Sequence, residues 1–319
     1  MAAAEAGAGT GMDTAAFDRA LAEADLAGFW TARVPAFEAE PGFLWPWSAV
    51  REALYRASRE IGIEAAERRV IKLVHPRYAG RAATRTVQPN FSIVNGGEVA
   101  RAHRHSIAAI RFVVEGSGAT TTVDGVCCTM APGDLIITPA GSWHDHHNAS
   151  DAPIIWLDGL DGPLVQSLNS AFFEGYGKDR QPVERHDAGG YRVSWQDALA
   201  GLARAPEDPY DGRVFRYPSI DGSSDTLPTM GCELSELAAG ASTRMHRHTH
   251  VAAYHVVEGS GETRVGNDTL RWSRGDTFTV PAWQWHGHAC ASDALARLFS
   301  INDRPALVAL GLHREEAAA

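Results

Sequence analysis

The sequence GEVARAHRH (residues 97–105) contains a Gly-x5-His-x-His pattern, and GASTRMHRH (residues 240–248) repeats it. Each copy is followed by Gly-Asp and then by a proline-initiated turn that ends in a third histidine. The copies are offset by 143 residues at the first histidine and by 142 at the third, which is His144 or His286. Histidines at i and i+2 of a strand lie on one face, and the third joins them only if the sheet closes on itself. The repeat therefore predicts a duplicated β-barrel.

Composition excludes several classes of protein. The 319 residues suffice for two domains of ordinary size. The formal net charge is −10 and no block of Lys and Arg occurs, so we expect no nucleic-acid partner. The first eleven residues do not resemble a secretory signal and no apolar stretch is long enough to span a bilayer, so we expect a cytoplasmic protein with no membrane partner. The four cysteines lack C-x-x-C spacing, which favours buried, reduced thiols.

Apolar periodicity and turn residues divide the chain into five segments. Helical spacing predicts helices over residues 13–28, 48–62 and 163–172. Short strands between Gly and Pro turns form two blocks, which predicts an all-β fold of two antiparallel jelly-roll barrels. The expected segments are a tail with a helical lead-in (1–66), an N-terminal barrel (67–162), a linker with a short helix (163–215), a C-terminal barrel (216–305) and a C-terminal tail (306–319). The last residues of that tail, HREEAAA (313–319), are expected to be mobile.

The histidine pattern resembles the two motifs of the cupin superfamily, in which the histidines are metal ligands. The resemblance implies that His103, His105 and His144 bind a metal ion, whereas an isolated histidine is more often a core or surface residue. Many members have a Glu four or five residues after the second histidine, where this chain has Ala109 and Ile110. Three neutral imidazoles leave the full divalent charge and up to three coordination positions open, which favours an anionic chelating ligand. Three histidines also suit zinc.

Strand parity predicts an arginine beside this metal. Arg111 has the same parity as His103 and His105, and the small Ala109 leaves space between them. A guanidinium offers two parallel donors to a carboxylate, so Arg111 is expected to bind the acid group of a substrate. The alternative is that Arg111 pairs with an internal Asp or Glu.

Longer stretches resemble the gentisate 1,2-dioxygenase family, which includes salicylate and 1-hydroxy-2-naphthoate 1,2-dioxygenases. The resemblance implies a bicupin whose N-terminal barrel holds one Fe(II) per subunit through the three histidines. It implies a homo-oligomer, a tetramer or dimer, that inserts O2 between the carboxyl- and hydroxyl-bearing carbons of a gentisate- or salicylate-type acid. The matching stretches are HRHSIAAIRFVVEGSG (103–118), GDLIITP (133–139), WHDHHN (143–148), WLDGLD (156–161) and YHVVEGSG (254–261).

The resemblance also implies that Arg111, His146 and Asp158 line or support the pocket. His146 could exchange a proton with the substrate hydroxyl, and Asp158 could orient a pocket imidazole or be a turn residue. Family members often carry Trp and Gln on the strand entering the pocket, where this chain has Gln88, Asn90 and Ser92, so the ring substituents stay open. Which of Arg68 and Arg69 faces the pocket is also open. The expected substrate-binding residues are Arg68, Arg69, Ser92, Ala109, Arg111 and Trp156.

The C-terminal half keeps three histidines that could bind a second metal: His246, His248 and His286. The repeat offset places Tyr254 opposite Arg111 and Ser300 opposite Asp158, so we expect a structural or weakly active centre there. His250 is expected to be a buried, hydrogen-bonded imidazole rather than a further ligand.

Two other functions fit the histidines. One is a cupin enzyme that uses zinc, manganese or nickel for other chemistry on carboxylates. The other is a non-catalytic bicupin that binds an aromatic acid as a sensor or store. The chain has no DNA-binding helix motif and no basic stretch, which disfavours a sensor that acts on DNA.

Overall fold

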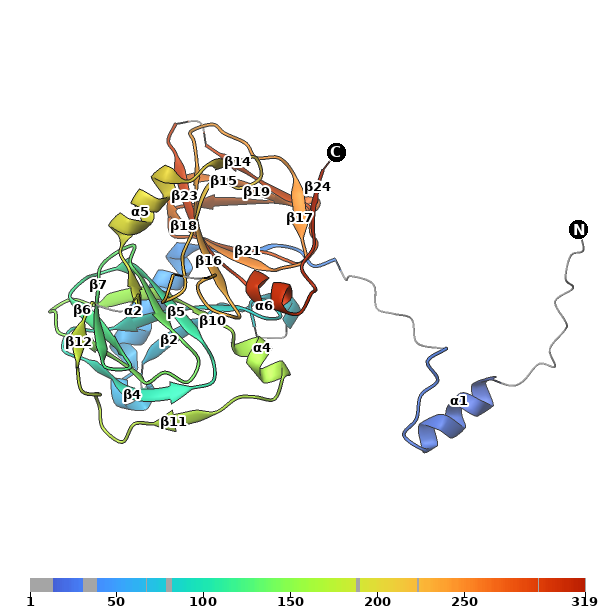
Figure 1. Cartoon of the computed structure of the whole chain (residues 1–319), viewed down its shortest axis with the longest axis horizontal. Coiled ribbons are helices and arrows are strands. Elements are labelled where there is room, and N and C mark those ends of the chain that lie inside the picture. Colours follow the sequence, from blue (N-terminus) through green and yellow to red (C-terminus); the bar gives the residue numbers. More distant parts are fainter. Residues whose placement is uncertain are drawn as a thin grey trace, which may run out of the picture. The chain divides into compact units, whose positions relative to one another are not determined.

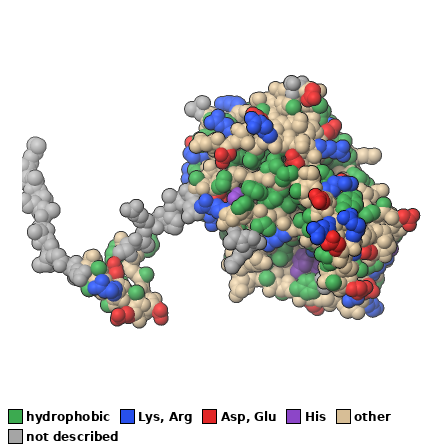
Figure 2. Space-filling model, turned by 180° about the vertical axis from the view of Figure 1, so that it is seen from behind, with side chains coloured by type: hydrophobic (Ala, Val, Ile, Leu, Met, Phe, Trp, Pro, Cys, Tyr) green, Lys and Arg blue, Asp and Glu red, His purple; other side chains and the backbone are tan. Residues whose placement is uncertain are grey.

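A computed structural model describes residues 14–30, 39–66, 68–78, 82–187, 190–222, 224–291 and 293–318. The chain forms two compact units, residues 1–38 and 39–319. In the first unit, the helix expected over 13–28 is α1 (Thr14–Glu23), while residues 1–13 of the expected tail lie outside the described part. No helix within the described ranges is long and apolar enough to cross a membrane. On the face shown in Figure 2, acidic and basic side chains are interspersed and form no basic stripe.

The second unit contains two β-barrels, as the repeat predicts (Figure 1). In the N-terminal barrel, one sheet has the strand order β13-β8-β5-β10-β3-β2 and the other β11-β4-β9-β6-β7-β12. A 3-10 turn, η1 (Pro76–Tyr78), follows β2. The principal strands are β2 (Arg69–Lys72), β3 (Gln88–Val94), β4 (Val99–His105), β5 (Ala109–Glu115), β6 (Ala119–Val123), β7 (Val126–Met130), β8 (Leu135–Thr138), β9 (His144–Asn148) and β10 (Ile154–Leu160).

The C-terminal barrel repeats this plan, with sheets ordered β1-β21-β18-β23-β16-β15-β14 and β20-β19-β22-β17-β24. The mobility expected for HREEAAA (313–319) is wrong for residues 315–317, because these form β24, which pairs with β17. The elements are β14 (Glu207–Asp208), β15 (Gly212–Arg216), β16 (Gly231–Leu237), β17 (His246–His248), β18 (Ala252–Glu258), β19 (Ser260–Val265), β20 (Asp268–Ser273), β21 (Thr277–Val280), β22 (His286–Cys290), β23 (Ala296–Asn302), α6 (Arg304–Ala309) and β24 (Glu315–Ala317).

One long strand through the first histidines, assumed in the parity argument, is wrong. Residues 106 and 107 form a bend, and β4 and β5 belong to opposite sheets of the barrel. Side-chain alternation therefore cannot be counted from His105 to Arg111. Arg111 lies inside the barrel because its neighbours on β5, Ile110 and Phe112, pack on the other face of the strand, in the apolar core shared with the C-terminal barrel.

The segment before each barrel is part of the duplication, which the sequence pattern did not reveal. The lead-in contains β1 (Phe43–Trp45), α2 (Trp47–Glu60) and α3 (Ile63–Ala66); the linker contains α4 (Gly162–Ser167), β11 (Phe173–Gly175), β12 (Arg185–His186), β13 (Arg192–Val193) and α5 (Trp195–Arg204). β1 joins the sheet of the C-terminal barrel and α2 then packs on β2 and β3 of the N-terminal one. In mirror fashion, β13 joins the N-terminal barrel and α5 packs on β15 and β16 (Figure 1).

The helices α2 and α5, which run from one barrel to the other, begin with matching hydrogen bonds. The backbone N–H of Trp47 donates to Asp276 at 2.8 Å, and that of Trp195 donates to Asp134 at 2.9 Å. Each carboxylate belongs to the Gly-Asp motif and satisfies an N–H that the helix itself leaves free. The second helix was expected to start after Ser48, but the capping acid comes from the other barrel and α2 begins at Trp47. The short linker helix ends at Ser167, earlier than expected.

A single apolar core joins the barrels. Phe112 of β5 stacks on Phe299 of β23 with ring centroids 4.2 Å apart, and one buried cluster contains residues of both barrels. The four cysteines are buried and free, as expected, and are Cys127, Cys128, Cys232 and Cys290.

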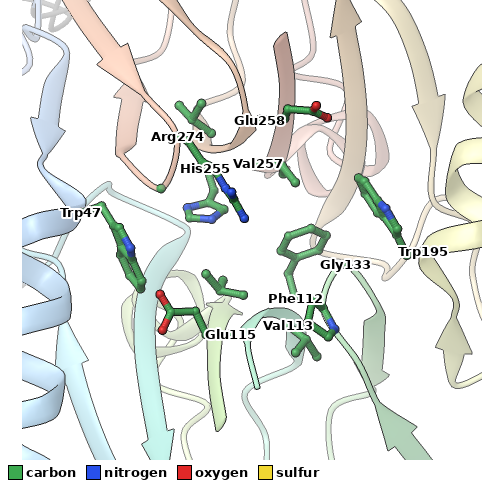
Figure 3. Close-up of a pocket in the computed structure, with 14 residues that line it drawn as sticks. Trp47, Phe112, Val113, Glu115, Gly133, Trp195, His255, Val257, Glu258 and Arg274 are labelled. Atoms are coloured by element: carbon green, nitrogen blue, oxygen red, sulfur yellow. The ribbon is translucent and has the colours of Figure 1, made fainter. Parts of the chain in front are cut away.

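A cavity of about 610 Å³ lies between the barrels but contains no histidine triad. Figure 3 shows Trp47 and Trp195 on opposite sides of it, with His255 and Arg274 reaching in from the C-terminal barrel. Burial and then the charge of Arg274 lower the pKa of His255 to about 3. Its Nδ1 lies 3.1 Å from Thr277 Oγ1.

Replacing His255 with glutamine should therefore reduce the loss of stability in acid. A folded pKa of about 3, below the ordinary 6.5, means that the unfolded chain binds the extra proton first. The imidazole stabilises the fold above pH 6.5, and this stability is lost as the pH falls from 6.5 towards 3. Urea unfolding at about pH 7 and pH 4.5 should show a drop smaller by on the order of a few kcal/mol in His255→Gln. The same substitution at the exposed His186 should leave the drop unchanged; an equal drop in both variants would contradict the assignment.

Candidate metal centre and substrate pocket

The first three motif histidines converge. His103 and His105 come from β4 and His144 from the first position of β9, where it pairs directly with His103. One ring nitrogen from each lies within 4.8 Å of the others. The ring centroid of His144 is 4.4 Å from that of His103 and 4.8 Å from that of His105. The barrel closure that the spacing predicts therefore brings the triad together.

Backbone carbonyls fix the tautomer of each imidazole. The Nδ1 atoms donate to Arg101 O at 2.7 Å, Ile107 O at 2.6 Å and Ser142 O at 3.0 Å, for His103, His105 and His144 in turn. Each Nε2 then carries a lone pair. The buried His144 Nε2 has no hydrogen-bond partner among the described residues, and a metal ion would satisfy it. The three rings therefore fit a divalent metal.

The triad is held in its neutral form, which is the form that binds metal. Burial, followed by the charge of Arg68, lowers the pKa of His103 to about 3 and that of His105 to about 4. Burial and the charge of Arg111 lower the pKa of His144 far below its usual range. Two arginines thus make the surroundings of the triad cationic.

A cavity of about 500 Å³ opens onto two residues of the triad, His103 and His105. The exposed Phe173 of β11 forms one wall and stacks on His103 with ring centroids 5.1 Å apart. The pairing of β11 with β4 holds this ring in place. The other walls include His105, Arg68, Ile107 and Leu160. The cavity is large enough for a bicyclic aromatic acid and has both apolar and cationic walls.

Arg111 is completely buried and pairs with an internal acid, the alternative that the sequence analysis kept open beside substrate binding. Its Nε lies 3.6 Å from Asp158 Oδ1, and its Nη1 donates to Thr138 Oγ1 at 2.6 Å. Its Nε and Nη2 have no hydrogen-bond partner in the described part of the chain. Burial lowers the pKa of Arg111 to about 10 against the attraction of Asp158, so it remains charged at neutral pH. The guanidinium therefore forms an ion pair with Asp158 and keeps N–H groups on Nε and Nη2 that can donate to a ligand.

Asp158 positions Arg111 rather than an imidazole. The carboxylate accepts hydrogen bonds from Ser92 Oγ at 2.5 Å and from Trp156 Nε1 at 2.9 Å. Ser92 and Trp156 are themselves fully buried and hold Asp158 in place. Trp156 also packs against His146, with ring centroids 5.1 Å apart.

His146 presents a lone pair towards Arg68. Its Nδ1 lies 2.8 Å from Thr121 Oγ1, and that hydroxyl donates to the sulfur of Met130 at 3.2 Å. Nδ1 therefore carries the proton. The free Nε2 lies 3.5 Å from Arg68 Nη1. Burial and the charges of Arg111 and Arg68 lower the pKa of His146 far below its usual range, so the ring acts as a neutral acceptor.

The two adjacent arginines have different surroundings. Arg69 is bound to Glu98 by two hydrogen bonds of 2.6 and 2.8 Å and donates to Ile61 O at 2.5 Å. Its guanidinium is therefore committed to the fold. Both arginines line the cavity, but the guanidinium of Arg68 lies beside His146 and is not held in the same way by an acid among the described residues, so a role in substrate binding stays a prediction that favours Arg68. Ala109 is buried in β5 opposite Leu160.

The second triad has the same strand arrangement. His246 and His248 come from β17 and His286 from β22, with one ring nitrogen of each within 4.8 Å of the others. Nδ1 of His286 donates to Gln284 O at 2.9 Å, and its buried Nε2 has no partner within the described ranges. His250 is the buried, hydrogen-bonded imidazole that the sequence predicts: it stacks on His248 at 3.4 Å and contacts His313 Nε2 at 3.3 Å.

Comparison with known proteins agrees with this geometry. Residues 90–159 and 233–302 each match the cupin domain. A gentisate 1,2-dioxygenase from Aquipseudomonas alcaligenes is 36% identical over 324 residues, which span 91% of this chain and 92% of that enzyme. The chain belongs to the gentisate 1,2-dioxygenase family. A 5-aminosalicylate 1,2-dioxygenase from Comamonas sp. is 38% identical over 96% of this chain and 91% of its own length.

Solved structures show that this member of the gentisate 1,2-dioxygenase family has the bicupin fold of its relatives. A salicylate 1,2-dioxygenase from Pseudaminobacter salicylatoxidans superposes with a TM-score of 0.88 at 26% identity, over 97% of this chain and 99% of the other. The same enzyme has been solved as an adduct with gentisate, again with a TM-score of 0.88. The predicted fold, two cupin barrels from an internal duplication, is confirmed.

Two residues of the pocket escaped sequence reasoning. Phe173 lies in the segment taken as linker, and only the edge pairing of β11 with β4 brings it to the triad. Thr138 ends β8 and orients Arg111. The GDLIITP match to the gentisate 1,2-dioxygenase family contained Thr138 and was the available signal; Phe173 had none.

Proposed function

We propose that this protein is an Fe(II)-dependent dioxygenase that opens the ring of a gentisate- or salicylate-type acid between the carboxyl- and hydroxyl-bearing carbons. The observation that carries the proposal is a three-histidine centre beside a buried arginine with unused donors. Relatives whose names state ring-cleaving 1,2-dioxygenase activity on gentisate, 5-aminosalicylate and 1-hydroxy-2-naphthoate support it. His103, His105 and His144 would hold one iron per chain.

The pocket suits an ortho-hydroxy aromatic acid. Arg111 and Arg68 supply the positive charge that a carboxylate needs in a site that contains no acid among the metal ligands. Phe173, Ile107 and Leu160 supply apolar walls for the ring. Holding both reactants in place can lower a barrier by about 7–11 kcal/mol when the geometry is good. A bound ferrous ion supplies open coordination positions and electrons for the reaction with dioxygen.

His146 would accept a hydrogen bond from the substrate hydroxyl. Its Nε2 lone pair is available because Thr121 fixes the proton on Nδ1. Burial and the neighbouring Arg111 and Arg68 disfavour a second proton on the ring, so His146 orients the hydroxyl as a neutral hydrogen-bond acceptor. Asp158 keeps Arg111 oriented without contacting the substrate.

An oxygen-electrode assay with a substrate panel tests the proposal. Iron-loaded protein should consume O2 with at least one of gentisate, salicylate, a substituted salicylate or 1-hydroxy-2-naphthoate, and mass spectrometry should find a product heavier by two oxygen atoms. Zinc-loaded protein is the control and should be inert, because zinc has no redox chemistry. No O2 uptake by the iron-loaded protein with any of the four acids would contradict the proposal.

We also propose that the chain acts in the cytoplasm as a homo-oligomer, a dimer or tetramer. Buried reduced cysteines are typical of a reducing compartment. Leu168, Phe172 and Phe173 are exposed apolar side chains on one stretch of chain, which is typical of a surface that another subunit covers. Light scattering of the purified protein tests the oligomeric state.

A further inference from the structure

The second histidine triad lies beside a carboxylate that the first one lacks. Asp211 stands between β14 and β15, with its Oδ2 3.9 Å from His246 Nε2 and its Oδ1 3.8 Å from His288 Nε2. The Nε2 atoms of His286 and His288 are buried and have no hydrogen-bond partner among the described residues. The imidazoles of His246, His248 and His286, together with the carboxylate of Asp211, are a donor set that divalent metals accept.

The duplication places a basic residue in one barrel and an acidic residue in the other at matching positions. His288 is the counterpart of His146: each Nδ1 lies 2.8 Å from a threonine hydroxyl, Thr263 or Thr121. His146 Nε2 faces Arg68, whereas His288 Nε2 faces Asp211. Arg68 immediately precedes the edge strand β2, and Asp211 immediately precedes its counterpart β15. An arginine of the first barrel thus corresponds to an aspartate in the second.

Other residues around the second triad also differ in charge from those around the first. The buried Arg111 of the first barrel corresponds to Tyr254 in the second, which is uncharged and packs on His288 with ring centroids 5.1 Å apart. Burial lowers the pKa of His246, whereas the nearby acids Glu315 and Asp208 raise it. The field at the second triad therefore attracts a metal ion and repels a carboxylate.

We propose that the second triad is a divalent metal site with Asp211 as its fourth ligand, and that this site does not take the aromatic acid. Donors on one ion at about 2.0–2.2 Å lie at most about 4.4 Å apart, so the position of Asp211 relative to His246 is suitable. Asp211 is close to His246 without belonging to the compact group of three, and its side chain is 32% exposed. A rotation of this side chain completes the site.

The carboxylate changes what the metal can do. It neutralises one positive charge and occupies one of the positions that the first triad leaves open. Tyr254 has no guanidinium, so it cannot bind a substrate carboxylate as Arg111 is proposed to do in the first barrel. The second site is therefore a structural metal centre, and the duplicated barrels divide catalysis and metal-dependent stability between them.

Cobalt(II) binding to chelator-stripped protein tests this, because its visible spectrum reports ligands and its titration reports stoichiometry. Wild type should bind two equivalents per chain, and His144→Ala, which disables the first triad, should bind one. Adding Asp211→Asn to His144→Ala should weaken that remaining equivalent by at least about tenfold and change its spectrum. Glu207→Gln, a nearby exposed acid, is the matched control and should change neither.

The substrate half of the proposal is tested by adding salicylate. The cobalt spectrum of His246→Ala, with only the first site loaded, should change, and that of His144→Ala should not. Asp211→Asn with wild-type affinity and spectrum, or a salicylate response in His144→Ala, would overturn the proposal. If His144→Ala does not fold, Asp211→Asn compared with wild type gives the same result on the second equivalent. No turnover is measured, so failure here is separate from failure of the proposed activity.

Discussion

Replacement of Arg111 by methionine is expected to lower kcat/KM for a salicylate-type acid by about 10³-fold while the iron content stays at one equivalent in the first barrel. Methionine keeps much of the volume and removes the charge-assisted donors. Among the described residues around the first triad, Arg111 has buried guanidinium nitrogens, Nε and Nη2, without a hydrogen-bond partner. Steady-state oxygen consumption and metal analysis on the same preparation check both halves of the expectation.

Two controls separate loss of substrate binding from loss of fold. Arg111→Met leaves Asp158 buried without its cation, so some loss of stability should accompany the kinetic defect, and thermal unfolding measures it. Arg297→Met removes a different arginine, which pairs with Glu236 and Glu258 in the C-terminal barrel, and should leave kcat/KM unchanged. Normal turnover by Arg111→Met, or iron lost in proportion to activity, would show that Arg111 does not bind the acid.

Replacement of His144 by alanine should remove iron from the first barrel and abolish ring cleavage, with activity reduced by at least about 10⁴-fold. Two imidazoles from one strand cannot enclose an ion without the third from β9. His147→Ala is the matched control, because His147 is on the same strand and points to its opposite face. Iron analysis and oxygen uptake check the pair; turnover retained in His144→Ala would mean that the first triad is not the catalytic centre.

Both triads were predictable from spacing alone, because the i, i+2 pair and the returning histidine leave few ways to close a sheet. Arg111 was predicted to point inward for a partly wrong reason. The chain bends at residues 106 and 107, and alternation within β5 decides the orientation, since Ile110 and Phe112 face the core between the barrels.

The role of Asp158 could not be read from its neighbours in sequence, since its partners Ser92 and Arg111 lie on two different strands. Phe173 and Asp211 were missed for a common reason. Their positions depend on which sheet edge a short strand joins, and that is set by tertiary pairing rather than by local periodicity.

The exchange of β1 and β13 between the barrels ties the halves together in a way that a simple tandem repeat would not. Each barrel takes an edge strand from the segment that leads into the other, and each crossing helix starts on an aspartate of the barrel that it leaves. Cutting the gene at its internal symmetry point would strip both products of a sheet edge and expose the shared aromatic stack. A stable single barrel is therefore not expected from truncation. The two halves should unfold in one cooperative transition.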